Sequence, residues 1–169
     1  MNLDDIDSGA LCIIDTNVLL YAEQGRSAQA QRLLRRCGSG EVNAVLPQPV
    51  WQELAHKLML AEALMKKIVS GNNPAAKLAA KAAEVQTLGL YRQKLRALRD
   101  LGLGFEACKR EDLFDSAQQL QEKYGLLVND SVILAISIRM QADALVSSDA
   151  AFRQIDEIPV FTPTDLRTT

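Results

Sequence analysis

Apolar runs that stop abruptly at polar residues recur along this chain. The first covers residues 11–14, is followed at once by Asp15, Thr16 and Asn17, and gives way to a second apolar run from Val18. A continuous apolar run of this length is typical of a buried strand in a parallel sheet. The pattern therefore predicts a strand that carries Asp15 at its carboxyl end, with a helix beginning directly after it.

Strand-like and helix-like segments alternate through the rest of the sequence. Strands are predicted at residues 11–14, 43–46, 105–108, 144–147 and 158–161, of which the third has the weakest pattern. Pro159 places the last strand at a sheet edge, because proline cannot donate a hydrogen bond to a neighbouring strand. Apolar residues three and four positions apart predict helices at 27–37, 49–69, 74–98, 111–124 and 131–140. This alternation predicts an α/β fold, with a parallel sheet covered by helices on both faces.

The helical stretch at residues 50–104 is longer than the usual connection between neighbouring strands. The sequence at residues 71–74 divides it into two helices, which we expect to form a hairpin that extends from the sheet. Gly89 weakens the middle of the second helix, since glycine is a poor helix former. We expect one domain spanning residues 1–169, in which this enlarged helical region contacts a substrate or a partner.

Length, charge and cysteine content narrow the class of protein. At 169 residues the chain has the size of one domain, and its net charge of −2 argues against nucleic-acid binding through bulk positive charge. Three widely spaced cysteines indicate neither a disulfide framework nor a zinc knuckle. Residues 1–7 are acidic, unlike a secretory signal, and no apolar run approaches the roughly 18 residues of a membrane span. These features predict a cytoplasmic protein.

Three more acidic residues stand at the polar ends of apolar elements, as Asp15 does: Glu53, Asp130 and Asp149. Each of the four also has a structural alternative as a helix cap, a turn residue or a first-turn acid. Gathered around one crevice, four carboxylates would repel one another unless a cation neutralised them. Oxygen ligands without histidine or cysteine favour Mg²⁺ or Mn²⁺ over zinc. The four acids therefore predict a site for one of these two metals.

On these residues the sequence resembles the PIN-domain family of metal-dependent ribonucleases, which includes the VapC-type toxins of bacterial toxin–antitoxin pairs. The resemblance covers about residues 11–163 and rests on the segments around the four acids, at 14–19, 50–54, 129–135 and 142–152. The last segment is the most specific. It carries the family's closing signature, an apolar strand followed by a hydroxyl residue, an acid and an aromatic residue, here Ser148, Asp149 and Phe152.

The resemblance implies a PIN-like fold with a five-stranded parallel sheet, and a nuclease site that hydrolyses RNA phosphodiester bonds with Mg²⁺ or Mn²⁺. The residues that match the family's metal-binding and catalytic acids are Asp15, Glu53, Asp130 and Asp149. Three neighbouring residues match groups that hold such acids in place or orient the substrate. These are Thr16, Asn17 and Ser148.

Partners follow from the same resemblance. An acidic site attracts RNA only if positive charge surrounds it, and we expect this charge on one helical face that carries Arg92, Arg96 and Arg99. A toxin would also bind a cognate antitoxin, and the helical region suits either that partner or a second copy of the chain in a homodimer. No contact with a membrane is expected.

Two other functions stay open on the sequence alone. A catalytically inactive PIN-like scaffold would bind RNA or a protein without cleaving it. A haloacid-dehalogenase-like phosphatase also begins with a strand and an aspartate, but it needs a second aspartate two residues later, where this chain has Asn17. The single histidine, His56, is interpreted as a packing or surface residue. A toxin and a housekeeping nuclease are not distinguished by these patterns.

Overall fold

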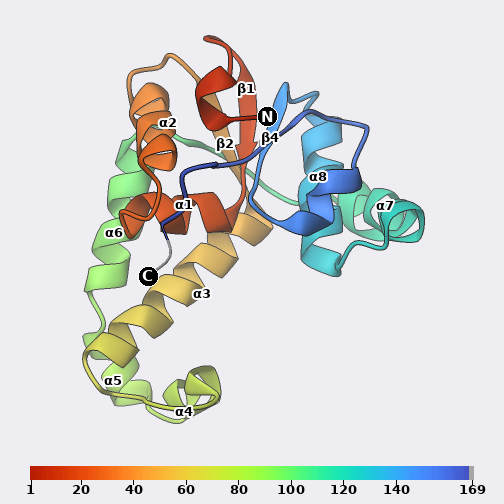
Figure 1. Cartoon of the computed structure of the whole chain (residues 1–169). Coiled ribbons are helices and arrows are strands. Elements are labelled where there is room, and N and C mark those ends of the chain that lie inside the picture. Colours follow the sequence, from red (N-terminus) through yellow and green to blue (C-terminus); the bar gives the residue numbers. More distant parts are fainter. Residues whose placement is uncertain (168–169) are drawn as a thin grey trace.

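The computed structural model of the protein describes residues 1–167, and its centre is a sheet of five parallel strands in the order β3-β2-β1-β4-β5 (Figure 1). The strands are β1 (Leu11–Ile14), β2 (Asn43–Pro47), β3 (Gly104–Glu106), β4 (Ala144–Val146) and β5 (Val160–Phe161). The predicted fold class and strand number are confirmed. β5 lies at an edge of the sheet, as Pro159 predicted.

Helices cover both faces of the sheet, with α2 and α6 on one side and α7 and α8 on the other in Figure 1. The α-helices in chain order are α1 (Thr16–Glu23), α2 (Ala28–Gly38), α3 (Gln48–Met65), α4 (Pro74–Ala79), α5 (Ala82–Thr87), α6 (Leu90–Asp100), α7 (Ala117–Tyr124) and α8 (Val128–Arg139). Within residues 1–167, none of these helices is both long and apolar enough to cross a membrane.

β1 is the central strand, and the register of its neighbours brings their carboxyl ends together. Cys12, Ile13 and Ile14 are fully buried, because both faces of the sheet are covered. Ile14 pairs with Val146 of β4, and the amide of Asp15 donates to the Val146 carbonyl oxygen at 2.9 Å. The residues that follow β1 and β4 therefore leave the sheet side by side.

The predicted helical hairpin is formed by α3 and α6, but its second arm is not one helix. The expected helix at 74–98 is wrong in this respect, since the chain forms α4, α5 and α6 with breaks between them. At the second break Leu88 adopts an extended conformation and is completely buried against a small cluster that includes Ala63, Val69 and Leu78. Burial of Leu88 therefore overrides the local helical pattern.

Glu62 of α3 stabilises the break between α5 and α6. Its side chain is almost completely buried, and its two carboxylate oxygens accept hydrogen bonds from the backbone amides of Gly89 and Tyr91, each at 2.9 Å. Lys66 forms an ion pair with the same carboxylate at 2.6 Å. The free amides at the start of α6 are thus satisfied by an acid from α3, which joins the two arms of the hairpin.

Several predicted boundaries also shift. α8 begins at Val128 rather than Ser131, so that Asp130 lies in its first turn and Leu127 takes the cap position. The third strand is 104–106 rather than 105–108, and the last is 160–161 rather than 158–161.

A π-helical turn at Asp112–Ser116 precedes α7 where a regular helix was expected. Arg139 of α8 stabilises this irregular region through ion pairs with Asp112 and Glu106, both at 2.8 Å.

Candidate active site

Asp15 lies at the carboxyl end of β1 and is 5% exposed. One carboxylate oxygen accepts a 2.6 Å hydrogen bond from the backbone amide of Thr16, which makes Asp15 the N-cap of α1. The other accepts a 2.6 Å hydrogen bond from the Ser147 hydroxyl and a longer one, 3.4 Å, from the Asn17 side chain. The helix-cap alternative is therefore real, and it leaves the carboxylate fixed at the sheet edge.

Glu53 comes to the same edge from α3. Its Oε2 atom accepts a hydrogen bond from the Thr16 hydroxyl at 2.8 Å, and its Oε1 atom lies 2.7 Å from the ammonium group of Lys57. About a third of the Glu53 side chain is exposed. Thr16 therefore connects the first two acids, because its amide contacts Asp15 and its hydroxyl contacts Glu53.

Asp149 and Asp130 approach from β4 and α8. Asp149 follows β4 and caps the next turn, since its side chain accepts a hydrogen bond from the Ala151 amide at 2.8 Å. Asp130 differs from the other three acids, because no described residue donates a hydrogen bond to its carboxylate. An ionised carboxylate that is partly buried without a hydrogen-bond donor costs free energy, and a nearby cation would lower that cost.

The charges of neighbouring acids affect the pKa values of Asp130 and Asp15. Burial, followed by the charges of Asp149, Asp15 and Glu53, raises the pKa of Asp130 to about 6. Burial also raises the pKa of Asp15; hydrogen bonds from Ser147 and Thr16 oppose this shift, and the charges of Glu53 and Asp149 add to it. The structure thus brings together the four predicted acids in one negatively charged cluster, which we call the acidic cluster.

The chemistry of the acidic cluster fits a hard divalent cation, but its side chains are not yet arranged as a coordination shell. Within residues 1–167, no three His, Cys, Asp or Glu side chains converge closely enough to hold a metal ion as they stand. The Lys57 ammonium pairs with one carboxylate oxygen of Glu53, and the Thr16 hydroxyl donates to the other. Mg²⁺ or Mn²⁺ would therefore compete with Lys57 for Glu53, although the all-oxygen set of ligands itself suits these ions.

Sequence reasoning missed Ser147. Its hydroxyl donates to Asp15 and accepts from the backbone amide of Asp149 at 3.0 Å, so it joins the two strand-end acids. The predicted Ser148 instead donates a hydrogen bond to the Tyr21 hydroxyl at 3.4 Å. Sequence alone did not distinguish the adjacent serines. The spacing of Glu53 and Lys57, one helical turn apart, was a readable signal for the ion pair.

Other predicted residues lie outside the acidic cluster. Arg92, Arg96 and Arg99 are exposed on α6; Arg92 stacks on the Tyr91 ring and Arg99 pairs with Asp100. None of the three contacts an acid of the cluster within the described residues. Their expected contact with RNA stays a prediction. His56 is exposed on α3, as the sequence indicated.

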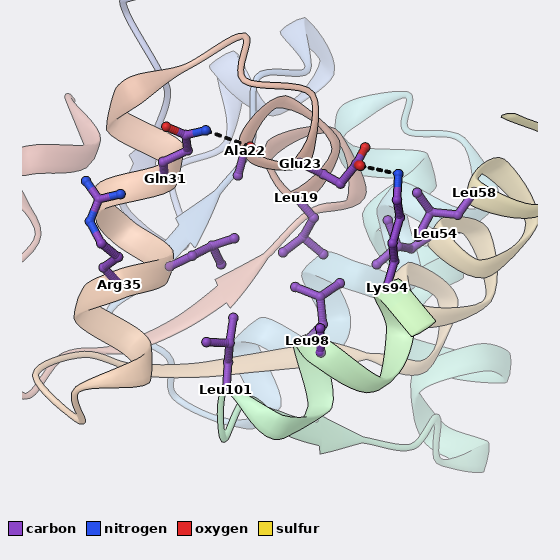
Figure 2. Close-up of a pocket in the computed structure, with 12 residues that line it drawn as sticks. Leu19, Ala22, Glu23, Gln31, Arg35, Leu54, Leu58, Lys94, Leu98 and Leu101 are labelled. Carbon is purple, nitrogen blue, oxygen red and sulfur yellow. Dashed lines mark hydrogen bonds and ion pairs between the residues drawn. The ribbon is translucent and has the colours of Figure 1, made fainter. Parts of the chain in front are cut away.

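A second concave feature, an apolar groove of about 470 Å³, lies between α1, α2, α3 and α6 (Figure 2). Leucines from all four helices line it, including Leu19, Leu54 and Leu98. The ion pair between Glu23 and Lys94 crosses one side of it in Figure 2. Most of the lining is apolar, with a few charged side chains such as Arg35 and Lys94, so the groove is suited to an apolar ligand or partner.

The chain was compared with protein-family models and with solved structures. A family model described as PIN domain matches residues 12–158. Similar solved structures include VapBC2 from Rickettsia felis bound to a DNA fragment from their promoter, with 16% identity, a TM-score of 0.60, and coverage of 90% of this chain and 98% of that one.

Two further structures show the same fold. A toxin–antitoxin complex from Klebsiella pneumoniae has 19% identity and a TM-score of 0.58, covering 92% of this chain and 99% of that one. VapBC-1 from nontypeable Haemophilus influenzae has 15% identity and a TM-score of 0.54, covering 90% and 97%. No curated protein sequence matches the chain significantly. At these identities the structural likeness concerns the fold.

Proposed function

The chain belongs to the PIN-domain family of nucleases, and from this premise we propose that it is an Mg²⁺- or Mn²⁺-dependent endoribonuclease. The proposed metal-binding and catalytic residues are Asp15, Glu53, Asp130 and Asp149. The observation that carries the proposal is Asp130, to whose carboxylate no residue of 1–167 donates a hydrogen bond, and whose pKa is raised to about 6 by burial and by the charges of the other three acids. Such an arrangement is favourable once a cation is bound.

The chain's own residues would hold the acids in a fixed arrangement. The Thr16 amide and the Ser147 hydroxyl orient both oxygens of Asp15, and the Thr16 hydroxyl orients Glu53. The bound metal would supply a water nucleophile at neutral pH and positive charge to stabilise the phosphorane oxygens. Because water and not the ribose 2′-hydroxyl attacks, the products should carry 5′-phosphate and 3′-hydroxyl ends.

The test of this function is cleavage of single-stranded RNA by the purified protein with Mn²⁺, followed by sequencing of the product ends. We expect cleavage that stops on addition of EDTA, and products that a 5′-phosphate-dependent ligase accepts directly. Products with 2′,3′-cyclic phosphate ends, or cleavage that persists in EDTA, would contradict the mechanism. RNA binding without any cleavage would favour the inactive scaffold instead.

We further propose that the protein is a toxin whose partner is a cognate antitoxin. The similar solved structures are toxin–antitoxin complexes. In addition, one helix of such a partner could bind in the apolar groove. Arg35 at the groove's rim makes no ion pair among the described residues, so it favours an acidic residue on that helix. The proposed occupant is thus an antitoxin helix with an apolar face and an acidic flank.

The groove proposal is tested with Ala97→Glu, which places charge at an exposed α6 position that lines the groove. We expect this variant to lose co-purification with the product of the adjacent reading frame. Ala61→Glu, the same change at an exposed α3 position outside the groove, should retain it. If both variants co-purify with this partner as well as wild type does, the partner binds outside the groove.

A further inference from the structure

Two arginines near the turn that carries Asp149 differ from Lys57 and Lys94, which form ion pairs with Glu53 and Glu23. Arg26 and Arg153 have no acidic partner within residues 1–167. Unpaired guanidinium groups next to a cluster of carboxylates are available to a polyanion that must approach that cluster.

Arg26 is held on one side of the turn by an aromatic ring. Its guanidinium carbon lies 4.9 Å from the centre of the Tyr21 ring, and its Nε atom donates to the backbone oxygen of Arg167 at 3.5 Å. The Tyr21 hydroxyl in turn accepts the hydrogen bond from Ser148, the residue before Asp149. Arg26 is therefore linked through the Tyr21 side chain to the turn, and its two terminal nitrogens make no hydrogen bond to any residue in the range 1–167.

Arg153 lies in the short 3-10 helix Ala150–Gln154, which Asp149 caps. Together with Ser147, Ser148, Asp149 and Thr162 it lines a small cavity of about 200 Å³. Its guanidinium makes no hydrogen bond or ion pair to any described residue, and the side chain is exposed. The hydroxyl protons of Ser147 and Ser148 are already donated to Asp15 and Tyr21, and the Asp149 carboxylate also lines the cavity. The group at this cavity that suits a phosphate is therefore the guanidinium of Arg153.

We propose that Arg26 and Arg153 bind RNA backbone phosphates on either side of the cleaved bond, so that the strand crosses the turn at Ser147–Asp149. This inference rests on the proposed ribonuclease function and deepens it. The acidic cluster repels RNA, and the two guanidinium groups supply attraction where the strand must pass. This proposal is separate from the predicted RNA contact of Arg92, Arg96 and Arg99 on α6.

The test is binding of a short fluorescent single-stranded RNA in EDTA, measured by anisotropy over a range of salt concentrations. In wild type the affinity should fall steeply with salt. In Arg26→Gln/Arg153→Gln the slope of log affinity against log salt should become shallower by roughly 1.4, about 0.7 for each lost phosphate contact to a single strand. Arg26→Lys/Arg153→Lys keeps both charges, and we expect it to keep most of the slope.

Lys67→Gln/Lys77→Gln is the matched control, because it removes two exposed positive charges near the far end of α3 and on α4 (Figure 1), where no contact with RNA is predicted. We expect this variant to bind RNA with the wild-type slope. The inference is overturned if the Lys67→Gln/Lys77→Gln variant loses as much of the slope as Arg26→Gln/Arg153→Gln does, or if Arg26→Gln/Arg153→Gln keeps it while wild type binds and cleaves RNA. If wild type neither binds nor cleaves RNA, the ribonuclease function fails as well, so the two failures are distinguishable.

Discussion

Replacing Asp15 by asparagine is expected to reduce metal-dependent RNA cleavage by at least about a hundredfold. That is the upper end of the loss seen when only a residue supporting a metal ligand is removed. The substitution keeps the size of the side chain and its acceptor for the Thr16 amide, but it removes the charge that faces the other acids. If the protein is a toxin, the growth arrest that wild type causes on expression should disappear with the same change.

The loss should not come from unfolding. Burial raises the pKa of Asp15, so its charged form costs stability at neutral pH, and that cost grows as the pH rises through the folded-state value. Asparagine is also a good N-cap for α1. The variant should therefore melt at the wild-type temperature or above it. Asp7→Asn, at an exposed acid outside the acidic cluster, is the matched control and should cleave normally. Full cleavage by Asp15→Asn would refute the assignment.

Replacing Glu62 by alanine is expected to lower the free energy of unfolding by about 2–3 kcal/mol, because two backbone amides and the ammonium of Lys66 lose their buried partner. The measurement is urea denaturation, with hydrogen exchange locating the loss at the start of α6. Glu84→Ala on α5 is the control, since no described residue pairs with its side chain. A Glu62→Ala protein as stable as this control would contradict the role of Glu62.

Glu62 should also contribute to the acid sensitivity of the protein. Burial alone would raise its pKa, but the Lys66 ammonium and the amides of residues 89–91 outweigh burial and lower the pKa to about 2, from the ordinary 4.5. The stabilisation is complete above pH 4.5 and is lost as the pH falls towards about 2. Glu62→Gln should therefore show a shallower loss of stability across this window. Parallel curves for wild type and variant would exclude such a contribution.

The central strands were predictable because burial on both faces leaves a continuous apolar run. Residues 11–14 and the strand ending in Val146 fall within one residue of their expected positions for this reason. The division of the second hairpin arm was not predictable, since Leu88 and Glu62 meet across the hairpin and local spacing does not report such contacts. Tertiary packing decides that region.

In the candidate site, too, some features could be predicted from the sequence and others depend on tertiary structure. The carboxyl ends of neighbouring parallel strands lie at the same edge of a sheet. The sequence pattern of strand followed by acid was therefore enough to predict that Asp15 and Asp149 lie near each other. The residue that links them, Ser147, depends on the rotation of the chain as it leaves β4, which sequence does not specify. Of the two arginines near this turn, Arg153 follows Asp149 by four residues, but Arg26 is far away in sequence and is connected to the turn through Tyr21 only in the folded chain.

The most direct test of the acidic cluster as a metal site is the melting temperature of wild type and Asp15→Asn over a titration with Mn²⁺. A ligand that binds only the folded state stabilises it by about 2.7 kcal/mol at one hundred times its dissociation constant. We predict a rise with Mn²⁺ concentration for wild type and little or none for Asp15→Asn. A wild-type protein that gains no stability from Mn²⁺, or a variant that gains as much, would contradict a metal site formed by these carboxylates.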